Sequence, residues 1–339
     1  MWRSASLALF AAAVLTGCGS ARPITVDQAP LTWPEQIEEQ ARVEFVKAIS
    51  RPEDFEIRKG FLQRVGEFLF GTTDVRLVRP MAVVAVNDAI YVADPGVRGV
   101  HRFDLKAGRH DLLTAEGERP LPSPVGLAVG RGGDVYVADS GLGQVLVIRP
   151  GATAAVPLAL PRLGQPTGLA FDAATDRLFV TDTTAHQVKV FGADGTLLTA
   201  IGQRGEEDGA FNFPTYLWRD VRGRLYVTDS LNYRVQVFDA DGKFLRKFGK
   251  AGDGTGDFMR QKGVATDTFG HVYIVDGLVS ALLIYDEAGR LLLSIGNLGQ
   301  SRGEFWLPAG IFIGEDNRIY VADAYNGRIQ IFRYIGGPT

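Results

Sequence analysis

Cysteine is nearly absent from this chain: Cys18 is the only one among 339 residues. A single cysteine cannot form an intramolecular disulfide or a cysteine metal cluster. Histidine, the commonest metal ligand, is also scarce, with four residues. These shortages argue against a resident metal centre, and we expect the protein to hold no metal and no cofactor.

The chain also lacks a surplus of basic charge and a membrane-length apolar run. Its formal net charge of −3 gives no basic footprint, so we expect no nucleic-acid partner. An apolar stretch from Ala5 to Val14 follows Arg3, and it is too short to cross a bilayer as a helix. Glycine, by contrast, is abundant at 41 residues, which favours tight turns between many short strands.

The first residues have the charged and apolar regions of a secretory signal. The apolar stretch ends in "LTGC", residues 15–18, which resembles the lipobox of bacterial lipoproteins. The resemblance implies a signal peptide over residues 1–17 and lipid attachment to Cys18, which then becomes the N-terminus. The alternative is an ordinary signal peptide with a chance cysteine.

Residue 19 bears on the destination of such a lipoprotein. In the lipoprotein pattern, aspartate after the cysteine retains the protein in the inner membrane, and Gly19 stands there instead. The resemblance therefore implies an outer-membrane lipoprotein that faces the periplasm. Residues 18–40 contain three prolines and little periodicity, so we interpret them as a tether.

A short motif recurs along the rest of the chain, which indicates a repeat architecture. The string aromatic-Val/Ile-x-Asp occurs six times, ending at Asp94, Asp139, Asp182, Asp229, Asp276 and Asp323. A second pattern, G-x2-G-x3-G-x-F, occurs three times in register, ending at Phe211, Phe258 and Phe305. Each unit holds four short strands; in the fourth unit we expect them near residues 215–220, 225–229, 234–239 and 244–248. Radially repeated units of four strands form a β-propeller.

The fourth unit resembles an NHL repeat, whose pattern contains Tyr-Val-x-Asp followed by Asn-x-Arg-Val. Asn232, Arg234 and Val235 match it there, and Asn326, Arg328 and Ile329 match it in the sixth unit. The resemblance covers about residues 78–335 and implies a six-bladed propeller. It implies no particular chemistry, since the family includes binding modules, sensor domains and a few enzymes.

The sixth repeat ends after its third strand, and an open ring would expose a long sheet edge. "EFVKAIS", residues 44–50, lines up with "KFLRKFG", residues 243–249, a fourth strand. We therefore expect Val43–Ile49 to pair with Arg328–Arg333. The prediction is an all-β, six-bladed β-propeller of four-stranded antiparallel blades over residues 41–339, closed by an N-terminal strand at 42–50.

One short inserted helix is predicted over residues 54–70, with Asp54 as its N-cap. Apolar residues at positions 61, 62, 65, 68 and 69 fall on one helical face. The closing strand places this segment in the loop from a fourth to a first strand, on the face where the family generally binds. It either caps apolar loop surface or forms a lid over the channel.

The repeat aspartates are expected to be structural, because a residue needed once for catalysis would not recur in every blade. Aspartate at a strand end accepts backbone N–H groups of a turn. His101, His110, His186 and His271 fall at four different repeat positions, so three of them should not meet at one ion. Acidic loops at Glu206 and Asp253 either attract a cation such as calcium or are simply solvated.

Trp218 and Arg219 are the candidate ligand-binding residues. Trp218 stands where other repeats have Ala128, Ala170 and Ala265. First strands line the channel and alternate their side chains, so one of the pair should face it, and aromatic residues with arginine are common binding anchors. The alternative is that Trp218 fills space between blades.

These features favour a lipid-anchored envelope protein whose propeller binds a protein or peptide partner. One alternative is a lyase or lactonase that acts at the channel. Another is a structural spacer in an envelope complex. No catalytic residue is assigned.

Overall fold

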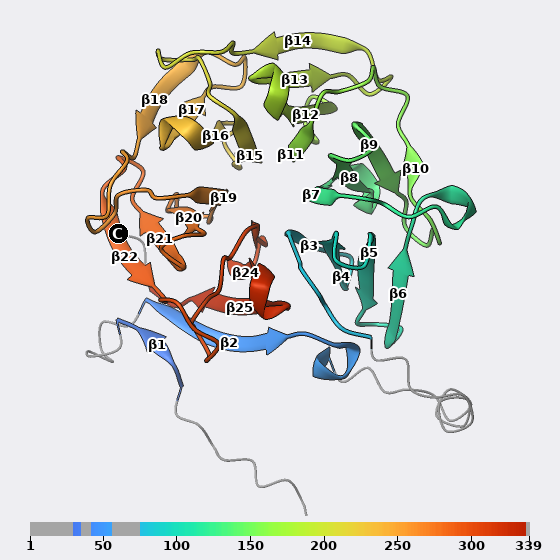
Figure 1. Ribbon diagram of the computed structural model, residues 1–339, viewed down its shortest axis with the longest axis horizontal. Helices are drawn as coiled ribbons and strands as arrows, with labels where there is room; N and C mark the ends of the chain where they lie inside the picture. Colours follow the sequence, from blue (N-terminus) through green and yellow to red (C-terminus); the bar gives the residue numbers. More distant parts are fainter. Residues whose placement is uncertain (1–29, 35–41, 56–74, 337–339) are drawn as a thin grey trace, which may run out of the picture. The chain divides into compact units, whose positions relative to one another are not determined.

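The computed structural model describes residues 30–34, 42–55 and 75–336. Within the unit that begins at Leu31, the described strands form six antiparallel sheets, five of four strands and one of five. The sheets stand around a central axis as the blades of a propeller, with the first strand of each repeat innermost (Figure 1). The predicted fold is confirmed.

The first three blades follow the chain from the inside outward. Blade 1 contains β3 (Ala82–Val86), β4 (Ala89–Asp94), β5 (Gly99–Asp104) and β6 (Arg109–Leu113). Blade 2 contains β7 (Pro124–Val129), β8 (Val135–Asp139), β9 (Gln144–Ile148) and β10 (Val156–Pro157). Blade 3 contains β11 (Pro166–Asp172), β12 (Arg177–Asp182), β13 (Gln187–Phe191) and β14 (Leu197–Ile201).

The other three blades complete the ring. Blade 4 contains β15 (Pro214–Arg219), β16 (Leu225–Asp229), β17 (Arg234–Phe238) and β18 (Phe244–Phe248). Blade 5 contains β19 (Gln261–Thr266), β20 (Val272–Asp276), β21 (Ala281–Tyr285) and β22 (Leu291–Ile295). Blade 6 contains β23 (Ile311–Ile313), β24 (Arg318–Asp323), β25 (Arg328–Tyr334), β2 (Val43–Ile49) and β1 (Thr32–Trp33).

The position of a strand in its blade decides its residue pattern. Every residue of β16 and β20 is buried, because both faces of a middle strand pack against neighbouring blades. The outer strands β18 and β22 alternate between exposed and partly buried residues until a buried final residue, because only their inner faces are covered. The core is therefore a set of apolar layers between blades.

The six repeat aspartates tie each blade to the loop that enters it. The backbone N–H groups of Val78 and Arg79 donate to Asp94 at 2.7 and 3.0 Å, and those of Met259 and Arg260 donate to Asp276 at 2.9 Å each. All six side chains are buried and accept N–H groups from the loop before the first strand of their own blade. The predicted structural role is confirmed.

The recurring G-x2-G-x3-G-x-F motif forms the loops that enter blades 4, 5 and 6. Its phenylalanines, such as Phe258, are fully buried. Gly249 has φ +95°, and a Cβ there would lie 2.1 Å from the Phe258 ring, so the motif needs glycine at this point. Arg234 holds the loop from the blade side, since its guanidinium donates to Asp229 and to the carbonyls of Glu206, Glu207 and Ala210.

The N-terminal strand closes the ring as predicted. β2 pairs antiparallel with β25, from Val43 opposite Tyr334 to Ile49 opposite Ile329. The interpretation of residues 18–40 as a tether is wrong for Thr32–Trp33, which form the extra strand β1 on β2. Trp33 is 7% exposed and its ring lies 5.7 Å from that of Phe332, so apolar burial holds this segment on the blade.

The predicted helix at 54–70 lies outside the described residues from position 56 onward. Its start differs from the prediction, since Pro52–Phe55 form a 3-10 turn in which Asp54 accepts the backbone N–H groups of Ser50 and Arg51. The described ranges contain only 3-10 turns and no longer helix. None of their helices could cross a membrane.

Candidate functional site: the central channel

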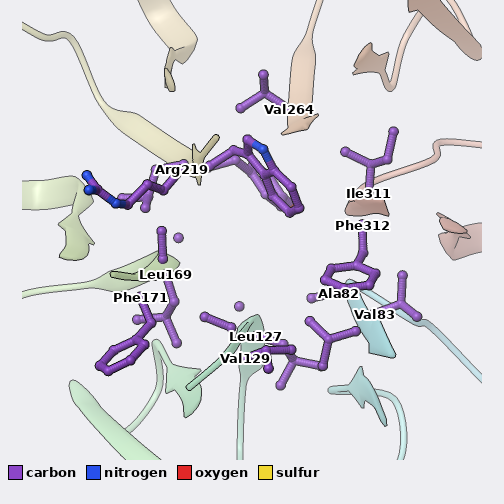
Figure 2. A pocket seen from close by; sticks show the side chains of 18 residues that line it. Ala82, Val83, Leu127, Val129, Leu169, Phe171, Arg219, Val264, Ile311 and Phe312 are labelled. Carbon is purple, nitrogen blue, oxygen red and sulfur yellow. The ribbon is translucent and has the colours of Figure 1, made fainter. Parts of the chain in front are cut away.

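The first strands of all six blades line a narrow cavity of about 200 Å³ on the propeller axis. Apolar side chains such as Val83, Leu127, Leu169, Val264 and Ile311 make up much of its wall (Figure 2). Such a wall has few polar groups to orient a ligand, so specificity has to come from the ends of the channel.

A wider cavity of about 810 Å³ opens at one end of the channel. It is lined by the turns that join first to second strands, including Asp88, Val221, Thr268, Glu315 and Asp316. This face is opposite the one that carries the entering loops. The sequence analysis placed the inserted segment and the family's binding face on the side of the entering loops. Four residues line both cavities and so mark the constriction between them: Val129, Trp218, Arg219 and Phe312.

Trp218 reaches from blade 4 toward blades 5 and 6. Its register opposite Tyr226 matches that of Ala128 opposite Tyr136, as the repeat alignment predicts. The indole N–H donates to Thr266 Oγ1 at 3.0 Å, and the ring meets Phe312 edge-on at 5.9 Å. Trp218 therefore packs between blades and also lines the channel, which combines the two alternatives from the sequence.

Arg219 turns away from the cavity centre toward blade 3 (Figure 2). Its guanidinium lies 2.7 Å from Asp172, donates to the Gly223 carbonyl at 2.6 Å, and stands over the Phe179 ring. Burial alone would raise the pKa of Asp172, but hydrogen bonds from Thr175 and Ala174 and the Arg219 charge lower it. The arginine is thus held by an inter-blade ion pair at the edge of the site.

A second set of aspartates, which the sequence analysis did not single out, lies at the ends of first strands. Asp267 accepts the His271 and Tyr273 side chains at 2.7 and 2.9 Å. Asp220, its counterpart in blade 4, accepts the Arg224 side chain at 2.7 Å. Because these aspartates recur and also cap their own turns, the Asp267–His271 pair is explained by structure.

The four histidines lie where the repeat alignment predicts: His101 in β5, His110 in β6, His186 after β12 and His271 before β20. Two of them meet, since His101 Nδ1 and His110 Nε2 are 2.9 Å apart in blade 1. Within residues 30–34, 42–55 and 75–336, no three His, Cys, Asp or Glu side chains are grouped closely enough to hold a metal ion.

Comparisons with known proteins agree with the geometry. The NHL repeat model matches residues 121–148, 163–191 and 305–332, and a model described as a 6-bladed beta-propeller matches residues 214–276. The fold thus defines a six-bladed β-propeller. Blades 2, 3 and 6 contain NHL repeats.

Solved structures with similar folds have different described roles. A streptogramin B lyase is 14% identical with a TM-score of 0.57, over 77% of this chain and 95% of that one. A putative gluconolactonase is 14% identical with a TM-score of 0.59, over 76% and 89%. An auxiliary nutrient binding protein from Bacteroides ovatus is 14% identical with a TM-score of 0.59, over 76% and 70%. No protein of curated function matches the sequence. At these identities the similarity concerns the fold alone.

Proposed function

We propose that the protein is a binding module of the bacterial envelope that recognises a protein or peptide partner. A lipid on Cys18 anchors it to the outer membrane, and the propeller faces the periplasm. The "LTGC" segment supports the anchor, and Gly19 supports the outer membrane.

The wide cavity at the channel end carries this proposal. Its volume of about 810 Å³ suits a side chain or chain end of a partner. Its floor combines Trp218 and Phe312 with Arg219, whose charge is paired with Asp172, and its rim carries Asp88, Glu315 and Asp316. Apolar anchoring inside a polar rim is the usual arrangement of a protein recognition site.

The test is capture of partners from solubilised envelope by the full chain. Trp218→Ala and Arg219→Ala should lose a partner that the wild type captures, while Arg131→Ala, an exposed residue outside both cavities, should keep it. Thermal unfolding of each variant separates lost binding from lost folding, because both residues also bridge blades. A partner retained by both channel variants would contradict the proposal.

The second candidate is a channel enzyme of the lyase or lactonase type. The similarity in fold to the streptogramin B lyase and the putative gluconolactonase motivates it. Elemental analysis that finds one tightly held zinc or calcium per chain, lost together with activity on chelation, would favour this candidate. A structural spacer in an envelope complex would instead tolerate every channel substitution.

A further inference from the structure

An exposed apolar arc lies on the face opposite the wide cavity, where the entering loops and the loops between second and third strands meet. It consists of six side chains from blades 4, 5 and 6: Phe213, Leu231, Met259, Leu278, Trp306 and Tyr325. They are between 36% and 55% exposed. Apolar groups gathered in this way on a protein surface mark interaction sites.

The arc follows the repeat register but occupies only half of the ring. Leu231, Leu278 and Tyr325 each stand two residues after a repeat aspartate. At the same position, blades 1, 2 and 3 have Gly96, Gly141 and Thr184. Since all six blades use the same fold, the repeat structure does not require apolar side chains here, and the arc needs another explanation.

The backbone under the arc is fixed before any partner arrives. The Leu231 N–H donates to the Asn212 carbonyl at 3.0 Å, and the Tyr325 N–H donates to the Trp306 carbonyl at 3.1 Å. The Trp306 and Tyr325 rings lie 5.9 Å apart. Anchors held in place in the free protein lose little conformational entropy on binding.

Three cations accompany the arc. Arg260 and Lys262 belong to its middle blade, and Arg79 is the counterpart of Arg260 in blade 1, beside blade 6. In the described part of the chain, none of the three has an ion-pair partner. The repeat aspartates below them are buried and already accept backbone N–H groups. Burial, and then the neighbouring Arg260, lower the pKa of Lys262, and the charge of Asp276 opposes them.

We propose that this arc binds an extended, acidic segment of a partner protein through apolar or aromatic side chains that alternate with carboxylates. An anionic membrane is disfavoured because Glu206, Glu207 and Asp253 are exposed in entering loops on the same face. A flat lipid surface would meet these carboxylates, whereas a narrow segment can follow the arc past them. This site is separate from the channel site, and either can fail without the other.

Selection of random short peptides on the purified full chain tests the proposal. We expect selected peptides to combine Asp or Glu with Trp, Phe or Leu. Trp306→Ser with Tyr325→Ser, and separately Arg260→Glu with Lys262→Glu, should weaken binding of the resulting soluble peptides by about tenfold or more. Leu198→Ser is the matched control, since Leu198 is an apolar residue, 51% exposed, on the outer strand β14, outside the arc and both cavities.

Several results would overturn the proposal once unfolding midpoints show that the variants fold. Selected peptides without acidic residues, or peptides that the arc variants bind as well as the wild type does, would do so. Arc-dependent binding to phosphatidylglycerol vesicles without peptide binding would assign the surface to a membrane. Arc-dependent self-association in sedimentation would assign it to a second copy. Peptide binding seen only after deletion of residues 56–74 would assign it to that segment.

Discussion

An aspartate at the end of the second strand recurs in all six blades, and blades 3, 4 and 5 have another at the end of the first strand. Both are short side chains that accept backbone N–H groups where strands turn. Asp276 accepts those of Met259, Arg260, Leu278 and Val279. Removing such an acceptor leaves several buried donors unsatisfied, which costs more than the bonds themselves contribute.

Asp276→Ala is therefore expected to lower the free energy of unfolding by about 2–4 kcal/mol. Asp253→Ala, an exposed loop residue, should change it by less than about 0.5 kcal/mol. Urea denaturation followed by tryptophan fluorescence measures both. Equal midpoints for the two variants would show that the repeat aspartate does not pin the loop.

The histidine pair in blade 1 gives the protein a pH-dependent stability. His101 is 2% exposed and lies between Asp94, 3.6 Å away, and His110. Burial, and then the neighbouring His101, lower the pKa of His110 from 6.5 to about 4. The folded chain therefore binds fewer protons than the unfolded chain between these values.

Stability should accordingly fall as the pH drops from 6.5 toward about 4. The full shift corresponds to a loss of at most about 3 kcal/mol, less any residual solvent screening of the ring. His110→Gln should flatten this part of the profile of unfolding free energy against pH. An NMR titration midpoint near 6.5 for the His110 ring would contradict the expectation.

At the scale of elements, the clasp formed by β1 and β2 controls the integrity of the ring. β2 covers the edge of β25, and Trp33 and Phe45 both pack on Phe332. Without β2, the outer edge of blade 6 would expose unpaired backbone groups and an apolar face.

Deleting residues 41–50 should lower the melting temperature sharply or cause aggregation through this edge. Deleting residues 19–29, upstream of β1, is the matched control and should leave melting unchanged. Scanning calorimetry with light scattering separates the two effects. A clasp deletion that melts like the parent and stays monomeric would refute the role of β2.

At the scale of the whole molecule, the proposed anchor is testable apart from the propeller. Cys18→Ser should give a form without lipid, either uncleaved or released, because serine lacks the thiol that takes the lipid and the acyl chains are what hold a lipoprotein on the membrane. Fractionation of the envelope with and without the substitution measures this. A serine variant that sediments with the outer membrane like the wild type would rule out the lipobox.

The sequence by itself determined the number of blades, their strands and the closure. These features depend on local patterns repeated along the chain, such as the buried aspartate after each second strand, and the strand at 42–50 carries the pattern of a fourth strand. The sequence also placed Trp218 opposite Tyr226, because register within a repeat follows from alignment.

Only the tertiary structure decided which residues from different blades meet. Arg219 pairs with Asp172, 47 positions earlier, and Trp218 reaches Phe312 across blade 5. The wide cavity, the His101–His110 pair and the apolar arc likewise join side chains that no single repeat contains. A repeat pattern specifies each blade separately, whereas the channel and the two faces are made where blades converge, and that geometry exists only after the ring has closed.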